Sequence, residues 1–282
     1  DQATLNHPSI AGSESEGFIN VFSDASGTTR QVPLFMMMGG VPYPSLALEV
    51  FRVAMETPSV IIHAADKIKG AGKPVLGVQV ADRFIPTDSY SQLFVNYRGG
   101  RNTFEYIPAV EVLDSSVLPR LKNKIILIGT SSTGLFDLKA TPFSNAMPGV
   151  EINATIIDNL IRSDPFTYDR LSEIGLNYTM VIVGGIVLTL ILTGMGPVAG
   201  GICTLVFFTV ALLGNYFYFF LDQRVVGMTY PLSGCTLILV VISLFNAFEE
   251  GRSKRFIQKA FSHYVAPEVV AQLVENPGTL TL

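Results

Sequence analysis

The chain has 282 residues, of which 49% are hydrophobic and 15% charged, and its formal net charge is −4. It is too apolar for an average soluble domain, and it lacks the basic excess typical of a nucleic-acid-binding protein. Its two cysteines, Cys203 and Cys235, lie in uncharged apolar runs. The polar part of the chain therefore has no disulfide to stabilise it and must fold around its own core.

Residues 1–173 carry charges throughout and have the mixed composition of a globular domain. Residues 18–22 are strand-like, residues 24–27 carry a turn signal, and residues 30–38 resume an extended apolar pattern. Together these segments predict a β-hairpin. Two further elements follow: a helix with Leu46, Val50 and Val53 on one face, and a strand over residues 93–97.

The clearest unit of this part begins at residue 124. Residues 124–129, Lys-Ile-Ile-Leu-Ile-Gly, predict a buried strand, and a loop rich in Gly, Ser and Thr follows them. A helix is expected after Pro148-Gly149, with an apolar stripe made of Val150, Ala154, Ile157 and Ile161. A strand, a polar loop and a helix in this order indicate an α/β domain with a mixed sheet and flanking helices.

Polar loops at strand ends are where such folds usually place ligands. The candidate ligand-facing residues are therefore Thr130, Ser131, Ser132 and Asp137. In the alternative interpretation Asp137 only braces its own loop by accepting hydrogen bonds from backbone amides. No pattern in residues 1–173 predicts a catalytic group of residues or a metal site.

Three long apolar segments follow. The chain carries no charge from Ile174 to Leu221, and again none from Val225 to Phe248. A membrane span needs roughly 20 apolar residues, and the sequence Gly-Met-Gly-Pro at residues 194–197 interrupts the first run. We therefore expect three spans, over residues 174–194, 197–221 and 227–248, with a very tight turn between the first two.

Charges beside the spans predict their orientation. Four basic residues follow the third span: Arg252, Lys254, Arg255 and Lys259. The basic residues at the other side are interleaved with acidic ones: Arg162, Arg170 and Arg224 with Asp164, Asp169, Glu173 and Asp222. Because cytoplasmic flanks carry the excess of Lys and Arg, residues 1–173 are expected outside the cell membrane and the C-terminal end in the cytoplasm.

Several segments resemble the blocks of a CHASE type 2 sensor domain. They are "EGFINVFSDASGTTRQVPLF", "PYPSLALEVFR", "LFVNYRGG", "NKIILIGTSSTGLFDLKATPF" and "MPGVEINATIIDNLI", in that order, within residues 12–162. The resemblance implies an extracytoplasmic bacterial sensor held by an N-terminal span and followed by three closely spaced spans. It also implies that the first part of the sensor and its N-terminal span precede residue 1.

The last segment, "FSHYVAPEVVAQLVENPGTLTL", is similar to the block that precedes the catalytic domain of class III nucleotidyl cyclases. The third span is expected to continue as a helix to Tyr264, and a second short helix to start at Pro267 and stop at residues 276–278. The signal-transducing residues would be Phe261, Tyr264, Pro267, Val269, Val270 and Leu273. A helix this short is marginal alone, so we expect it to pair with its copy in a homodimer.

The organisation expected from these features is a sensor domain over residues 1–170, three spans over 171–248 and a cytoplasmic transducing helix over 249–282. The resemblance implies an adenylate cyclase of the plasma membrane that uses ATP and two Mg²⁺ or Mn²⁺ ions, whose ligands would lie beyond Leu282. Two alternatives stay open. His263 and Pro267 have the spacing of a histidine-kinase phosphorylation helix, although Tyr264 replaces the acidic residue typical there, and the protein could also be a receptor without an enzyme.

Overall fold

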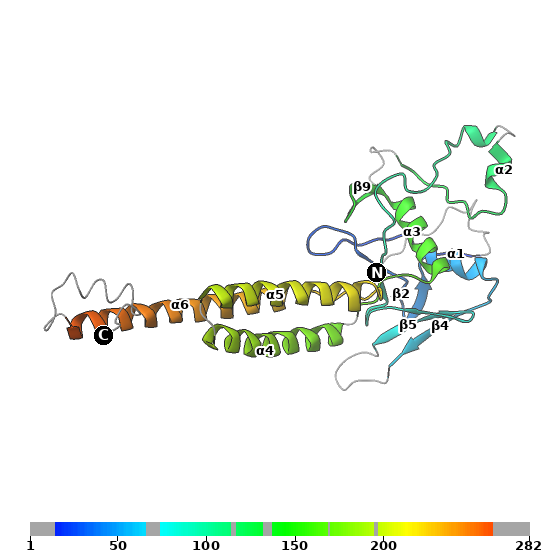
Figure 1. The fold of residues 1–282 in the computed structure, drawn as a ribbon. Helices are drawn as coiled ribbons and strands as arrows, with labels where there is room; N and C mark the ends of the chain where they lie inside the picture. The colour runs from blue at the N-terminus through cyan, green and yellow to red at the C-terminus, as the bar shows by residue number, and fades with distance from the viewer. Residues whose placement is uncertain are drawn as a thin grey trace. The chain divides into compact units, whose positions relative to one another are not determined.

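The computed structural model describes residues 15–65, 74–113, 117–131, 137–168, 170–194 and 197–261. The chain forms two compact units. The first unit comprises Asp1–Arg170 together with Leu221–Val225, and the second comprises Leu171–Phe220 and Val226–Leu282. The first unit contains small sheets and helices, and the second contains three long apolar helices (Figure 1).

The strands of the first unit pair in four small antiparallel sheets. Strand β1 (Gln31–Pro33) pairs with β7 (Gln92–Phe94), and β2 (Phe35–Met38) forms a hairpin with β3 (Val41–Pro44). The largest sheet has the order β4–β5–β6, and β8 pairs with β9; their bounds are Val60–Ala64, Val75–Val80, Arg83–Pro86, Leu138–Thr141 and Ser144–Pro148.

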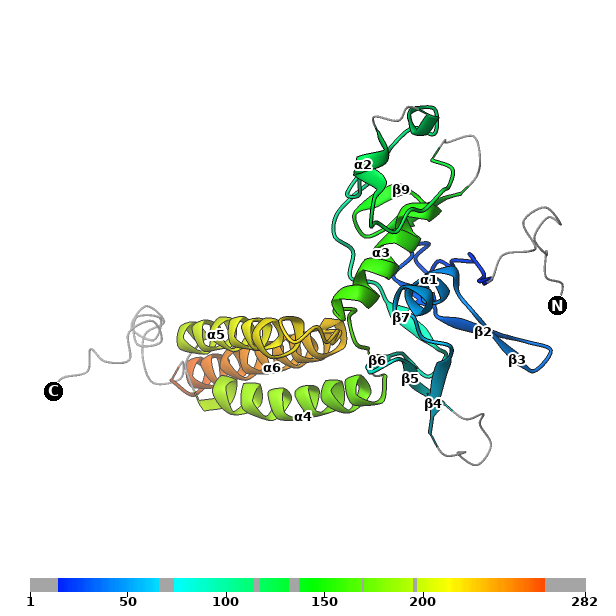
Figure 2. The same cartoon turned by 90° about the vertical axis from the view of Figure 1, so that its right-hand side faces the viewer.

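Helices α1 (Leu46–Ala54) and α3 (Gly149–Arg162) lie side by side over the core of this unit (Figures 1 and 2). The remaining helical pieces of the unit are short: a 3-10 turn at Glu111–Leu113 and α2 (Leu118–Leu121). The fully buried side chains of the core come from both helices and four strands or their ends: Leu34, Leu48, Phe51, Val78, Val80, Leu93, Met147, Ile152 and Leu160. The predicted fold class, a domain of strands and flanking helices before a helical membrane part, is thus confirmed.

Two details of the predicted elements near the start of the chain are wrong. Residues 18–22 form no strand and no hairpin with residues 30–38; Phe18 instead pairs with the segment before α1, donating its N–H to the Pro44 carbonyl at 3.0 Å. Residues 31–38 are extended as predicted, but as two strands with different partners, and the side chain of Leu34 between them is completely buried.

The second wrong detail is the face of α1. The buried residues of this helix are Ala47, Leu48 and Phe51, whereas Val53 is 51% exposed.

The predicted strand at residues 124–129 is also absent. This segment has no regular secondary structure, and Ile125, Ile126 and Ile128 are 45%, 53% and 96% exposed. Gly129 nevertheless lies against α3, because a Cβ atom there would come within 2.6 Å of the Val150 side chain.

Helix α3 also turns a different face to the core than the predicted stripe. Of the four stripe residues only Ile157 is buried, and the buried apolar face is Ile152, Ile156, Ile157 and Leu160. The reason is that this helix also buries polar side chains, so the apolar residues alone do not mark its inner face.

One buried polar side chain of α3 completes the strand ladder of the first unit. The side chain of Asn159 is fully buried; its Oδ1 accepts the Asn96 N–H at 2.8 Å and its Nδ2 donates to the Asn96 carbonyl at 3.0 Å. The side-chain amide therefore acts for Asn96 as a neighbouring strand would, satisfying both backbone groups just beyond β7.

The second unit consists of α4 (Arg170–Gly194), α5 (Pro197–Asn215) with a π-helical end at Tyr216–Phe220, and α6 (Thr229–Phe261). The three lie side by side (Figures 1 and 2). The stretches long and apolar enough to cross a membrane are Glu173–Gly194, Ala199–Phe220 and Thr229–Ser253, so a helix that could span a membrane lies at each of the three predicted positions. The turn expected between the first two lies partly outside the described residues.

Glycines bring these helices close together. A Cβ atom at Gly184 would lie 3.1 Å from the Cys235 sulfur, and one at Gly185 would lie 2.7 Å from the Ile238 side chain. From the opposite side, Gly234 of α6 faces Val181 of α4 at 3.2 Å. Small residues at these positions let α4 and α6 approach as helices do in lipid, where packing replaces the hydrophobic effect.

Replacing Asn159 with Ala is expected to destabilise the first unit by about 1–3 kcal/mol, because the half-buried N–H and C=O of Asn96 would lose their partners. The measurement is the urea midpoint for loss of amide hydrogen-exchange protection in α3, in the full-length protein. Lys122→Ala, at an exposed position, is the control and should change the stability by less than ~0.5 kcal/mol. Equal midpoints for the two variants would contradict the role given to Asn159.

Candidate functional site

Two of the described segments that carry candidate ligand-facing residues reach the N-terminal end of α3, at Gly129 beside Thr130 and at Asp137. Thr130 is exposed, and the carbonyl of the half-buried Ser131 accepts a hydrogen bond from Arg101 Nη2 at 2.9 Å. Ser132 lies outside the described residues. The structure thus joins the loop that carries Ser131 to the loop that carries Arg101.

Asp137 lies directly over the first residue of α3. Its carbonyl accepts the Gly149 N–H at 2.9 Å, and a Cβ atom at Gly149 would come within 2.5 Å of both carboxylate oxygens. A carboxylate in this place interacts favourably with the positive end of the helix dipole, and only glycine leaves room for it. This geometry supports the bracing role of Asp137, while a ligand-binding role for Thr130, Ser131, Ser132 and Asp137 stays a prediction.

A buried carboxylate that the sequence analysis did not single out organises the neighbouring loop. Glu151 is only 2% exposed. It accepts hydrogen bonds from the N–H groups of Asn102, at 3.2 Å, and Thr103, at 2.8 Å, and from the Tyr106 hydroxyl at 2.7 Å. Three donors thus satisfy the carboxylate, as a buried charge requires.

The electrostatics of this contact keep Tyr106 protonated. Burial, and then the hydrogen bond to the Glu151 carboxylate, raise the pKa of the Tyr106 phenol. The hydroxyl therefore donates over the whole physiological pH range. One signal in the sequence could have pointed to Glu151: it stands in the first turn of α3, where an acidic side chain commonly accepts backbone N–H groups.

The two loops and the helix end make one polar surface, which we call the α3 N-terminal surface: Arg101, Thr103, Tyr106, Thr130, Ser131, Asp137 and Glu151. Its groups donate and accept hydrogen bonds, and its two carboxylates already have positive or donor groups beside them. Within the described parts of the chain, no three His, Cys, Asp or Glu side chains are grouped as metal ligands would be. Hydrogen-bonding groups of this kind suit a polar ligand.

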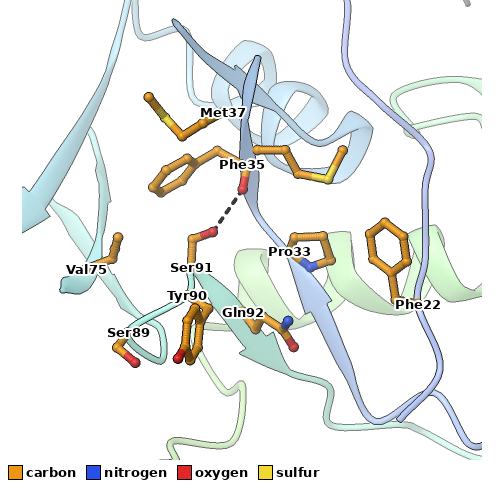
Figure 3. Close-up of a pocket in the computed structure, with 10 residues that line it drawn as sticks. Phe22, Pro33, Phe35, Met37, Val75, Ser89, Tyr90, Ser91 and Gln92 are labelled. Carbon is orange, nitrogen blue, oxygen red and sulfur yellow. Dashed lines mark hydrogen bonds between the residues drawn. The ribbon is translucent and has the colours of Figure 1, made fainter. Parts of the chain in front are cut away.

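A separate apolar hollow lies between β2 and the segment that leads into β7 (Figure 3). Its volume is about 350 Å³, and it opens to solvent. The lining is mainly Phe22, Pro33, Phe35, Met36, Met37, Val75 and Tyr90, and the Ser91 hydroxyl at its floor donates to the Phe35 carbonyl at 2.8 Å. None of the predicted site residues lines it, and an apolar group is the chemistry that it suits.

The transducing residues are described only where they begin. Phe261 is the last residue of α6, and Tyr264, Pro267, Val269, Val270 and Leu273 lie outside the described residues. The third long apolar helix continues as far as Phe261, and the cytoplasmic location of its end stays a prediction.

Glu151→Ala should loosen the loop of residues 101–106, since hydrogen bonds to a charged group contribute about 1.5–3 kcal/mol each. Hydrogen exchange of the Thr103 amide in the full-length protein should become faster, with Glu151→Gln giving an intermediate rate because it keeps an acceptor oxygen. The matched control is Glu105→Ala on the same loop, where the exposed pair with Arg120 contributes only ~0–1 kcal/mol. A Thr103 amide that exchanges equally in all three variants would rule out this anchoring role.

Comparison with known proteins gives one match. No curated protein and no solved structure matches the chain. The CHASE2 domain matches residues 2–194, which include the described sheets, α3 with its polar surface, and the first helix that could span a membrane. The match covers well over half of the 282 residues, and the chain therefore belongs to the CHASE2 domain family.

Proposed function

We propose that this chain is the sensory and membrane portion of a transmembrane class III adenylate cyclase. A CHASE2 sensor domain followed by three helices that could span a membrane is consistent with a transmembrane sensor. In the proposal, an extracytoplasmic ligand acts on residues 1–173, and the full-length protein converts ATP into cyclic AMP and pyrophosphate at the cytoplasmic side of the plasma membrane.

The observation that carries the proposal is the length of α6. The apolar window of this helix ends at Ser253, but the helix runs on without a break to Phe261. Phe261 is the first residue of the Phe-x-x-Tyr-Val-x-Pro-x-Val-Val block that resembles the lead-in of a cyclase domain. A continuous helix of this kind is suited to carry a movement from the membrane to a domain that follows it.

The proposal also needs a dimer. In the class III cyclases that the last segment resembles, each active site forms between two subunits. The apolar edge of Val269, Val270 and Leu273 offers a surface through which two copies could pair. The two Mg²⁺ or Mn²⁺ ions would activate the 3′-hydroxyl of ATP and stabilise the leaving group. The proposal places their ligands after Leu282, so no residue of this segment takes part in that step.

The basic residues at the end of α6 support a cytoplasmic C-terminus. Arg252, Lys254, Arg255 and Lys259 all belong to the last turns of this helix, beyond or at the end of its apolar window. Positive charge beside a span favours the cytoplasmic side.

The orientation predicts the outcome of alkaline-phosphatase fusions, because this enzyme becomes active only after export. Fusions after residue 165 should be active, and fusions after residue 255 should be inactive. A cytoplasmic reporter such as β-galactosidase at the same two positions is the control and should give the opposite pattern. Active phosphatase at residue 255 would overturn the orientation.

Charges on the apolar edge of the last helix should abolish coupling. Replacing Val269 and Leu273 together with Glu in the full-length protein should lower cyclic AMP production about tenfold or more, because an unpaired charge in an apolar interface is costly. Chemical crosslinking of the two copies should fall in parallel. The matched control is Gln272→Glu, which adds a charge beside this edge without removing an apolar side chain.

The outcomes distinguish the proposed function from its alternatives. Unchanged crosslinking and unchanged activity in the double variant would contradict the coupling helix. ATP-dependent phosphorylation of His263 without cyclic AMP would favour a sensor histidine kinase, and the absence of both reactions a receptor without an enzyme.

A further inference from the structure

The connection between the second and third membrane helices takes part in the sheet of the sensor unit. At the end of β7, Phe94 pairs with Phe166 in an antiparallel bridge, and the Phe166 N–H donates to the Phe94 carbonyl at 3.1 Å. The next residue, Thr167, pairs with Arg224 in a parallel bridge. Residues 166–167 therefore extend the β1–β7 sheet, and residues 223–225 form its outermost ribbon.

Three hydrogen bonds hold this ribbon to Thr167. The Thr167 N–H donates to the Gln223 carbonyl at 2.7 Å, the Val225 N–H donates to the Thr167 carbonyl at 3.0 Å, and the Thr167 hydroxyl donates to the Gln223 carbonyl at 3.2 Å. Gln223 has the left-handed backbone conformation, with φ at +57°. This bend lets the Gln223 carbonyl and the Val225 N–H both face Thr167.

Thr167 is itself fastened to the core of the sensor unit. The Arg98 guanidinium, four residues past the end of β7, bridges Asp158 of α3 and Asp164, at 2.6 Å from each carboxylate. The Asn96 amide donates to the Asp164 carbonyl at 3.0 Å. Aromatic contacts continue the attachment, since the Phe94 ring lies 6.3 Å from the rings of both Phe166 and Tyr168.

These contacts explain why the connector Leu221–Val225 belongs to the first compact unit although the helices on both sides of it belong to the second. Helix α4 begins at Arg170, shortly after Thr167, and α6 begins at Thr229, shortly after the clamped residues. Thr167 thus precedes α4 in the chain and is hydrogen-bonded to the connector that precedes α6.

We propose that Thr167 is the point through which the sensor domain holds two membrane helices at once. It holds α4 through the continuous chain, and α6 through the connector clamped between Gln223 and Val225. A displacement of the sheet edge at Phe94 then reaches the start of α6 directly, without first passing along α4 and α5. This coupling needs no particular output domain and stands independently of the proposed cyclase activity.

A cysteine pair at the two bridged positions tests the clamp within one protein. Thr167→Cys with Arg224→Cys, in full-length protein in lipid nanodiscs with Cys203→Ala and Cys235→Ala, should form a disulfide because bridge partners lie within disulfide distance. Hydrogen exchange is then compared between the oxidised and reduced forms. Oxidation should slow exchange about 5-fold or more in residues 221–225 and in the first turns of α6, a stabilisation similar to that of one added hydrogen bond.

A second variant weakens the clamp, so it should change hydrogen exchange in the opposite direction to the disulfide. Val225→Pro removes the N–H that donates to the Thr167 carbonyl, and should speed exchange in the connector and at the start of α6. Thr167→Val keeps both backbone hydrogen bonds and loses only the hydroxyl contact, so its effect should be smaller. Protection of β4–β6 serves as the internal check that the sensor unit is still folded.

Two results would overturn the proposal. The geometry is wrong if the cysteine pair does not oxidise while the protein is folded. The coupling is wrong if the connector tightens or loosens as expected while exchange in the first turns of α6 stays the same. Neither readout depends on nucleotide chemistry, so a full-length protein without cyclase activity would leave this test intact.

Discussion

The sensor unit depends on polar side chains of α3 that are paired inside the protein. At one end of the helix, Glu151 holds the N–H groups of residues 102 and 103, and near the other end Asn159 holds the backbone of Asn96. The segment of residues 96–106 is therefore attached to α3 at these two places and also through the ion pair of Arg98 with Asp158. Each attachment gives hydrogen-bond partners to backbone groups outside the strand pairs, so the helix acts as an ordered support for loops as well as a source of apolar contacts.

In the second unit, which contains α4, α5 and α6, polar groups must also be paired. In hydrocarbon every backbone group must be paired within its own segment, and helices satisfy this rule. Hydroxyl groups along the spans follow it too, since Thr189, Thr204 and Thr236 each donate to the carbonyl one turn earlier. These hydroxyl groups are thus satisfied within their own helices, whereas Asn246 of α6 donates to the Leu192 carbonyl of α4 at 3.2 Å. Glycine contacts between α4 and α6 add close packing to that hydrogen bond.

The sequence predicted the membrane part better than the sensor part. An uncharged run of about 20 residues has few alternatives to a long apolar helix, and the structure has such a helix at each of the three expected positions. The strand expected at residues 124–129 was wrong because an apolar run shows a preference for burial and does not show which partner is available. The inner face of α3 was missed because Asn159 and Glu151 are buried through hydrogen bonds, which hydrophobic periodicity does not register.

In the candidate site, too, local features could be predicted from the sequence, whereas long-range contacts could not. The loop around Asp137 could be located from its polar composition, and the structure places it at the start of α3. The convergence of Arg101 on Ser131 and of Tyr106 on Glu151 joins residues 30 to 45 positions apart, and no local pattern indicates such contacts. The attachment of the connector at Gln223 to Thr167 spans 56 positions and is likewise a property of the folded chain alone.

The uncovered isoleucines of residues 125–128 have a practical consequence for work with this protein. An exposed apolar segment that is rich in β-branched residues and lacks proline is prone to aggregation, because it can pair with the same segment of another molecule. Preparations of the sensor portion in which this strip stays accessible will tend to aggregate, most of all at high concentration. A polar replacement at Ile128, the most exposed of the three, is the change that improves solubility with least disturbance to the core.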